Sequence, residues 1–199
     1  MTHDSKSHYS GNLCQPLDMA DVYEVFWEKH FSREGITISL RPLSLPTDEL
    51  LLRGLAYLEL PERAEIAETL FRTKKDELTM LALSDFGQSF LGIIDGQPAF
   101  LAIVHRIQQH VMGNFYPALP GDYKFSLERL PVINDSPSDA FAFAVWQSCT
   151  DFLLGFPEVR RLITALDIFR PSEKQYCRAA GFRPLARTGG SNLEELYCR

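Results

Sequence analysis

The C-terminal segment from Arg160 to Arg199 constrains the fold more than any other part of the sequence. An apolar run of leucine, isoleucine and alanine ends at Asp167 and is typical of a short buried strand. Pro171 presets the backbone of a first helical turn, and Gly181 ends the helix because glycine adopts the left-handed conformation at little cost. Two β-rich runs joined by a Gly-Gly turn follow. The segment therefore predicts a strand, a helix and a two-stranded hairpin.

The first part of the chain predicts further helices and one strand. Asp18 can cap a helix through Phe31, in which apolar residues recur at helical spacing. The segment Ile36 to Leu40 alternates apolar and polar residues, as a half-exposed strand does. Two amphipathic helices are predicted next, one from Thr47 with Leu50 on its apolar stripe and one from Pro61.

The middle of the chain predicts an antiparallel meander. Its three β segments are Leu78 to Leu83, Phe90 to Ile94 and Ala99 to Ile107, and turn-forming residues separate them. His105 and His110 lie at or beyond the end of the third segment. An odd separation of five residues would place them on opposite faces of a continuing strand. We interpret each as a surface or loop histidine rather than a catalytic group.

The remaining elements complete an α/β (α+β) domain. A strand is predicted from Tyr123 to Leu130, and a helix from near Pro137 is apolar nearly all round and should be buried. We expect a mixed, mainly antiparallel central sheet of about six or seven strands with helices on both faces. The strand at Leu162 should run parallel to the strand at Tyr123, because a helix connects them.

The composition favours one core and disfavours nucleic acid as a partner. The hydrophobic content of 45% is ample for a single core in a chain of 199 residues. The formal net charge of −6 leaves no basic stripe to neutralise phosphates. Residues 1–17 are polar and aperiodic, and they predict a mobile arm that contributes little to folding. Residues 18–199 then form a single domain that includes the extra helix from Asp18.

The cysteines and the apolar stretches suggest neither a metal site nor a membrane segment. Cys14, Cys149, Cys177 and Cys198 have no spacing that is typical of zinc ligands or of a disulfide framework, so we expect free thiols and no metal. The N-terminus has no apolar signal core, and no run of about 18 apolar residues occurs. We expect a cytoplasmic protein with no membrane partner.

Several motifs resemble a known family. The sequence PEVRRLITALD is followed by AGF, with Asp167 fourteen residues before Gly181. Tyr116 with PALPGDYKFSLERL and the segment LRPLSLPTDELLL from Leu40 to Leu52 extend the similarity over about Ile36 to Arg199. The chain resembles the GCN5-related N-acyltransferases, and in particular the siderophore-type branch that acylates hydroxylated lysine or ornithine side chains.

The resemblance implies an acyl-CoA co-substrate and direct attack of an amine or hydroxylamine nitrogen on its thioester. The candidate catalytic residues are Asp167, for proton handling or acceptor binding, and Ser126, which stands where the branch has a histidine. A hydroxyl cannot act as a general base without help, so Ser126 would instead line the acceptor pocket or simply fill the space that the histidine leaves. Tyr116 and Asp122 are candidate substrate-binding residues. The implied partners are a small-molecule amine or hydroxylamine and a siderophore-pathway protein.

The segment after the predicted Tyr123 strand departs from the family pattern. Acyl-CoA transferases of this superfamily usually have a basic, glycine-rich loop here that holds the pyrophosphate. No Lys or Arg lies between Arg129 and Arg160, and Asp135 and Asp139 would repel phosphate at the helix start. We therefore expect weak acetyl-CoA binding. Two functions stay open: an acyl-CoA-dependent N-acyltransferase, or a catalytically degenerate relative that binds a small molecule or a partner.

Overall fold

The computed structural model describes residues 5–7, 13, 25–59, 63–114, 116–130, 139–167, 171–185 and 194–199. These residues form a 9-stranded sheet in the order β1-β2-β3-β4-β5-β6-β7-β9-β8. The strands are β1 (Ser5–Ser7), β2 (Trp27–Phe31), β3 (Ile36–Pro42), β4 (Gly87–Ile94), β5 (Gln97–Arg106), β6 (Asp122–Arg129), β7 (Arg161–Asp167), β8 (Arg183–Pro184) and β9 (Glu194–Cys198). The α-helices are α1 (Leu45–Glu59), α2 (Ala64–Ala82), α3 (Asp139–Leu154) and α4 (Pro171–Ala179), with 3-10 turns η2 (Ile107–Gln109) and η3 (Val111–Asn114).

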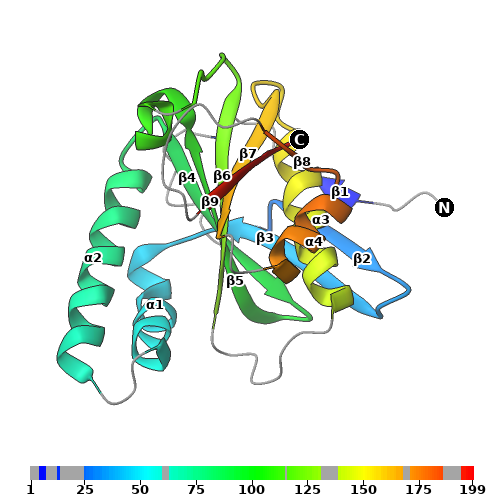
Figure 1. Ribbon diagram of the computed structural model, residues 1–199. Helices are drawn as coiled ribbons and strands as arrows, with labels where there is room; N and C mark the ends of the chain where they lie inside the picture. Colours follow the sequence, from blue (N-terminus) through cyan, green and yellow to red (C-terminus); the bar gives the residue numbers. More distant parts are fainter. Residues whose placement is uncertain are drawn as a thin grey trace.

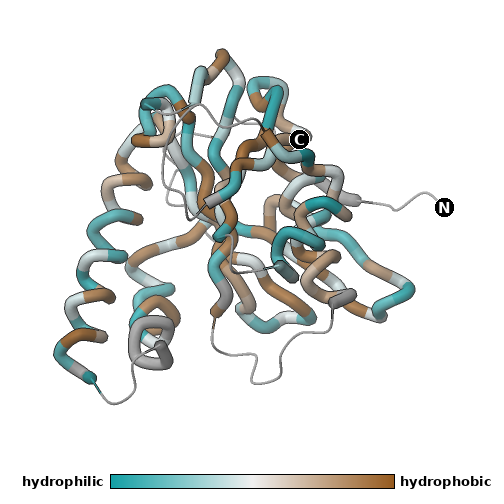
Figure 2. The backbone as a smooth tube through the Cα atoms, viewed as in Figure 1, coloured by the Kyte–Doolittle hydropathy of each residue, from teal (hydrophilic) through white to brown (hydrophobic). Residues whose placement is uncertain are grey.

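The sheet separates two layers of helices. Helices α1 and α2 cover one face, and α3 and α4 cover the other (Figure 1). One hydrophobic core, which includes Trp146 and Tyr176, lies on the α3 and α4 side, and a second, which includes Leu52 and Leu78, lies on the α1 and α2 side. Figure 2 shows the hydrophobic residues concentrated on the central strands between these layers. The predicted fold class is therefore confirmed.

The C-terminal unit also has the predicted order. Strand β7 pairs in parallel with β6, with Leu162 opposite Tyr123. Helix α4 begins at Pro171, and Gly181 beyond its end has φ 92°, in the left-handed region that favours glycine. The predicted Gly-Gly turn of the hairpin and the start of the helix near Pro137 lie outside the described residues.

The hairpin of β4 and β5 has a two-residue turn. Asp95 and Gly96 have φ of 48° and 81°, as in a type I′ turn. Ile94 and Gln97 are the cross-strand pair that flanks this turn. Such a turn matches the twist of the two strands, and it sets their register as far as the irregularity between Gly92 and Ile93.

The helix predicted from Asp18 to Phe31 is wrong over the part that the structure describes. Trp27–Phe31 is strand β2, and its side chains alternate between buried and exposed. Trp27, Lys29 and Phe31 point inward, and the strand pairs with β3 from Trp27↔Leu40 to Phe31↔Ile36. The alternation of buried and exposed residues extends over only five positions, and the apolar residues of this segment also fit helical spacing. The sequence alone therefore favoured a helix.

The strand predicted from Leu78 to Leu83 is also wrong, because α2 continues through Ala82. Leu78 and Leu81 are buried on one face of this helix, whereas Met80 is 65% exposed. Three-residue spacing of the buried positions is helical rather than extended. The apolar stripe expected on α1 is shifted as well: Leu50 is 81% exposed, and Leu52 is buried.

The N-terminal segment contacts the domain at the positions that the structure describes. Ser5–Ser7 pairs with β2 as strand β1. Leu13 is buried, and its backbone N–H donates to Glu158 Oε1 at 2.6 Å. These residues differ from the mobile arm expected over residues 1–17. Within the described ranges, no helix combines the length and apolar character needed to cross a bilayer.

Candidate functional site

The site is built where the only parallel pair of the described sheet separates. Strands β6 and β7 pair through Asp122↔Arg161, Tyr123↔Leu162 and Lys124↔Ile163, and their ladder ends there. Beyond this point β6 continues to pair with β5, and β7 with β9. No described β7 residue pairs with β6 after Lys124. Backbone groups on this edge of β6 can therefore hydrogen-bond a ligand in place of a strand.

The closed end of the pair is held by an ion pair. Arg161 Nε and Nη2 donate to the two carboxylate oxygens of Asp122 at 2.7 and 2.6 Å, and the Leu119 N–H donates to Asp122 Oδ2 at 2.8 Å. Asp122 is buried. Hydrogen bonding to Asp122 raises the pKa of Arg161. This bidentate contact fixes the register of β6 against β7.

Tyr116 lies beside this ion pair. Its side chain is buried, and its ring centroid is 6.0 Å from the Arg161 guanidinium carbon. Burial raises the pKa of Tyr116, and the negative charge of Asp122 raises it further. The structure therefore brings Tyr116 and Asp122 together around Arg161, a partner that lies 39 residues from Asp122 in the sequence.

Ser126 lies just beyond the opening of the pair. It is half-buried on β6, opposite Ile103 of β5. Because side chains alternate along a strand, Ser126 shares a face with Lys124 and Glu128. Glu128 forms an ion pair with Lys74 of α2, so this face is the one covered by α1 and α2.

Asp167 lies farther along the diverging strands. It is the last residue of β7, half-buried and opposite Glu194 of β9. At a rise of about 3.3 Å per residue, it is about 13 Å along β7 from the last β6–β7 pair, against about 7 Å along β6 for Ser126. The four predicted residues share one face of the sheet, but Asp167 is not brought next to Tyr116 and Asp122.

A pair of histidines, His105 and His110, completes this face. His105, near the end of β5, is opposite Lys124 of β6, and its ring centroid is 5.0 Å from that of His110. His105 is only 8% exposed, and its Nδ1 atom has no hydrogen-bond partner within the described chain. The interpretation of His105 as a surface histidine is therefore wrong.

The odd spacing of the two histidines was misleading for a structural reason. Strand β5 ends at Arg106, and η2 turns the chain back, so His110 returns to the side of the sheet that carries His105. His110 Nδ1 accepts a hydrogen bond from the Met112 N–H at 3.0 Å, and its Nε2 lies 3.2 Å from Lys124 Nζ. The end of the strand, directly after His105, was the only sequence signal for this turn, and it is a weak one.

Burial and positive neighbours set the charge of these rings. Burial, followed by the charges of His110, Lys124 and Lys74, lowers the pKa of His105 to about 4. Burial and Lys124 lower the pKa of His110 to about 4, against a smaller opposite effect of Glu77. Both imidazoles are therefore uncharged near neutral pH. No group of three potential metal ligands was found among the described residues.

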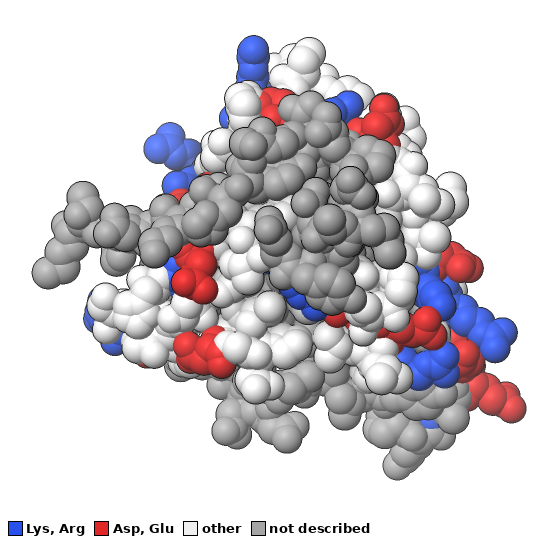
Figure 3. All heavy atoms as spheres, turned by 180° about the vertical axis from the view of Figure 1, so that it is seen from behind, with Lys and Arg blue, Asp and Glu red and all other residues white. Residues whose placement is uncertain are grey.

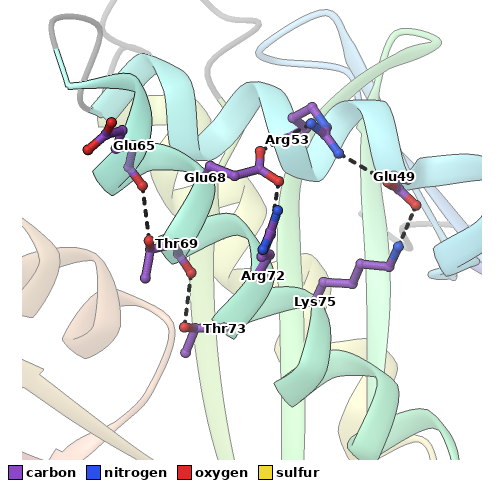
Figure 4. Close-up of polar contacts among 8 residues, drawn as sticks. All are labelled: Glu49, Arg53, Glu65, Glu68, Thr69, Arg72, Thr73 and Lys75. Carbon is purple, nitrogen blue, oxygen red and sulfur yellow. Dashed lines mark hydrogen bonds and ion pairs between the residues drawn. The ribbon is translucent and has the colours of Figure 1, made fainter.

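The surface of the helical layer carries charges of both signs. In Figure 3, acidic and basic side chains are interspersed at the edge where α1 and α2 lie. Several of them bridge the two helices: Arg53 donates to Glu68, and Lys75 to Glu49 (Figure 4). These ion pairs hold α1 against α2 over the sheet face that carries the site.

Comparison with known proteins identifies the fold. No protein-family model matches the sequence, and no curated protein matches it. Among solved structures, the aminoglycoside acetyltransferase AAC(6')-Ib in complex with ribostamycin and coenzyme A matches with a TM-score of 0.65 and 14% identity, over 81% of this chain and 91% of that chain. The fold is that of the GCN5-related N-acyltransferases.

Two further structures support this assignment. An uncharacterised protein from Bacillus halodurans matches with a TM-score of 0.71 and 15% identity, over 86% of this chain and 88% of that chain. An acetyltransferase from Thermus thermophilus matches with a TM-score of 0.54 and 22% identity, over 81% of this chain and 96% of that chain. At these identities the likeness establishes the fold alone.

Proposed function

We propose that the protein is an acyl-CoA-dependent N-acyltransferase that acts on a small amine or hydroxylamine. The observation that carries this proposal is the parallel β6–β7 pair, whose ladder ends at Lys124↔Ile163 and leaves one edge of β6 without a strand partner in the described sheet. Structures of this fold, such as AAC(6')-Ib with ribostamycin and coenzyme A, combine coenzyme A with an amine-bearing small molecule.

The proposed reaction needs little covalent chemistry from the protein. The acceptor nitrogen attacks the thioester carbon, the carbonyl electron pair moves to oxygen, and the adduct collapses to an amide or hydroxamate and the CoA thiolate. Backbone N–H groups of β6 beyond Lys124 would stabilise the developing oxyanion. The remaining tasks are to position the acceptor and to move its proton to the leaving thiolate.

The acceptor that we propose is a hydroxylated lysine or ornithine side chain, as in the siderophore-type branch. Support comes from the motif around Asp167 and from a net charge of −6, which favours a cationic small molecule. Asp167 would bind the acceptor or handle its proton, and Ser126 and Tyr116 would line its pocket. Asp122 would act through Arg161, because its carboxylate is already engaged there.

The activity can be measured as thiol release from acetyl-CoA. Release should require an acceptor, with N-hydroxylysine or N-hydroxyornithine preferred over lysine, ornithine and an aminoglycoside, and mass spectrometry should detect the acylated product. Asp167→Asn should lower turnover on the order of 10²-fold, because it removes a charge while keeping the shape of the side chain. Its unfolding midpoint should match that of the unchanged protein. Equal turnover would remove Asp167 from the mechanism.

The alternative is a binding module without catalysis, and one sequence observation favours it. The segment between Arg129 and Arg160 has no basic residue to hold the CoA pyrophosphate. A ligand at about a hundred times its dissociation constant would stabilise the fold by roughly 2.7 kcal/mol. We expect no such melting shift at sub-millimolar acetyl-CoA, so turnover should be assayed at millimolar donor. No thiol release with any of these acceptors under that condition would favour the binding module.

A further inference from the structure

We propose that the imidazole of His105 takes up the proton that the acceptor nitrogen loses during acyl transfer. The inference rests on the proposed function and assigns it a catalytic residue. Three observations carry it: the position of His105 at the opening of the β6–β7 pair, a buried ring nitrogen without a partner in the described chain, and neighbours that keep the ring uncharged.

The position follows from the register of three strands. His105 of β5 is opposite Lys124 of β6, and Lys124 is also the last β6 residue that pairs with β7. Side chains of an opposed antiparallel pair lie on the same face, with Cβ atoms about 5 Å apart. His105 therefore lies at the point where the two parallel strands separate, on the face that also carries Ser126.

The ring itself lacks a hydrogen bond that burial normally requires. His105 is 8% exposed, and Nδ1 has no partner among the described residues. Buried polar atoms in native proteins are nearly always hydrogen-bonded, and exceptions point to a functional role or a ligand. An N–H or O–H group of an amine or hydroxylamine acceptor would provide the missing donor for Nδ1.

The surroundings of His105 favour the form that can accept a proton. Burial lowers the pKa of His105 to about 4, together with the charges of three neighbouring groups. These groups are His110 from the η2–η3 connection, Lys124 from β6 and Lys74 from α2. An uncharged imidazole has a lone pair for the proton, whereas a charged one has none. A base this weak suits the reaction, because the nitrogen of the tetrahedral adduct is positively charged and much more acidic than the free amine.

The proton balance is complete without a further reactant. The C–N bond forms as the thioester π pair moves to oxygen, and the proton on the now cationic nitrogen moves to His105 Nδ1. The oxyanion then collapses, the C–S bond breaks, and the imidazolium returns the proton to the CoA thiolate. His110 is a positioning residue: its Nδ1 is fixed by the Met112 N–H, so its ring holds a defined place 5.0 Å from His105.

Substitution of His105 tests the inference. Asparagine places an oxygen near the position of Nδ1 but cannot take up a proton, and alanine removes both functions. Turnover should fall on the order of 10²-fold in both His105→Asn and His105→Ala. KM for the acceptor and the calorimetric affinity for acetyl-CoA should change little in His105→Asn. If His105→Asn kept full turnover, the role of His105 would be purely structural, and the proposal would be overturned.

A matched control is available in His30. This histidine is exposed on β2, and its Nδ1 hydrogen-bonds the Thr37 hydroxyl at 3.1 Å. His30→Asn should keep full turnover and the same pH profile. In the unchanged protein, kcat should fall at acidic pH as His105 becomes protonated, and His105→Asn should lose this acidic limb. An unchanged acidic limb in His105→Asn would contradict the proposal even if turnover fell.

A measurement independent of turnover separates this inference from the proposed function. Nitrogen-15 spectroscopy of the imidazole can follow His105 Nδ1 while N-hydroxylysine is added with CoA present. Nδ1 should shift as it gains a hydrogen bond, and His30 should not shift. Absence of turnover with a clear Nδ1 shift would reject the transferase but keep His105 as an acceptor-binding group. An unshifted Nδ1 at saturating acceptor would overturn the inference, whether or not the protein is an active transferase.

Discussion

Asp122 and His105 are both buried polar side chains near the start of β6, yet their surroundings give them different properties. Asp122 accepts two hydrogen bonds from Arg161 and one from the Leu119 N–H. The Nδ1 atom of His105 has no partner within the described residues. A carboxylate that is already fully engaged stabilises the fold, whereas an unpartnered ring nitrogen is available to a ligand.

The two histidines should make the protein sensitive to acid. Their pKa values are about 4 in the folded chain, against about 6.5 in the unfolded chain. The unfolded chain therefore binds more protons as the pH falls, so stability is full above about pH 6.5 and is lost toward pH 4. Urea unfolding between about pH 7 and pH 4.5 should show this loss. The double variant His105→Asn and His110→Asn should flatten the slope, and an equal slope would contradict the prediction.

Removal of the Asp122 carboxylate should destabilise the chain. Asp122→Ala leaves Arg161 and the Leu119 N–H without their charged acceptor, which should lower the free energy of unfolding by about 2 to 3 kcal/mol. Denaturant unfolding measures this loss. Asp85→Ala is a suitable comparison, because Asp85 is exposed in the bend before β4 and should change stability little. Equal stability of the two variants would show that the ion pair does not fasten β6 to β7.

At this scale the sequence singled out candidate residues but not the partners that they contact. Tyr116 and Asp122 could be selected from their motif, but Arg161 lies 39 residues beyond Asp122 and only the parallel pairing brings it near. His105 and His110 were assigned to the surface or to a loop, and the turn at η2 that brings them together leaves no strong mark in the sequence. Contacts between distant segments depend on topology, which local patterns do not contain.

Among the elements, proline and glycine residues predicted the ends of helix α4 accurately. Helix α4 begins at Pro171, and Gly181 follows it with a positive φ, as the sequence indicated. Short apolar runs were ambiguous instead. Strand β2 has only five residues, and Leu78 to Leu83 fits a strand in isolation although α2 continues through it. Runs of this length fit either periodicity, so tertiary packing decides between them.

Helix α1 offers a comparison between a buried and an exposed ion pair. Asp48 is buried and accepts hydrogen bonds from both terminal nitrogens of Arg41 and from the Ser44 N–H at the start of the helix. The neighbouring Glu49 bonds to Lys75 on the outer surface (Figure 4). Burial of the first pair makes the loss of one partner costly, whereas solvent screens the second.

Substitution of the two acids should therefore have unequal effects. Asp48→Ala should lower the free energy of unfolding by about 3 kcal/mol, because it leaves the half-buried Arg41 guanidinium without its carboxylate partner. Glu49→Ala should change stability little, and any change should disappear at high salt. Denaturant unfolding of both variants at low and high salt measures the difference. Similar losses in the two variants would show that Arg41 is not confined by its surroundings.

For the whole molecule, the N-terminal segment extends the sheet. Strand β1 covers the outer edge of β2, and Leu13 belongs to the core that also contains Trp27 and Phe26. The polar composition of residues 1–17 suggested that the segment contributes little to folding. Yet Leu13 is buried and Ser5–Ser7 pair with β2. The composition of a segment does not show where a single apolar side chain packs.

Deletion of residues 1–17 should consequently destabilise the protein. It uncovers the edge of β2 and removes Leu13, which is 2% exposed and whose N–H binds Glu158. Loss of a buried leucine side chain typically costs about 2 to 5 kcal/mol, which corresponds to a fall of about 4 to 20 °C in the melting midpoint of a domain of this size. Leu13→Ala should reproduce much of this fall while keeping β1. Leu50→Ala, at a leucine that is 81% exposed, should leave the midpoint nearly unchanged. An unchanged midpoint in the deletion would restore the view of residues 1–17 as an arm that folding does not need.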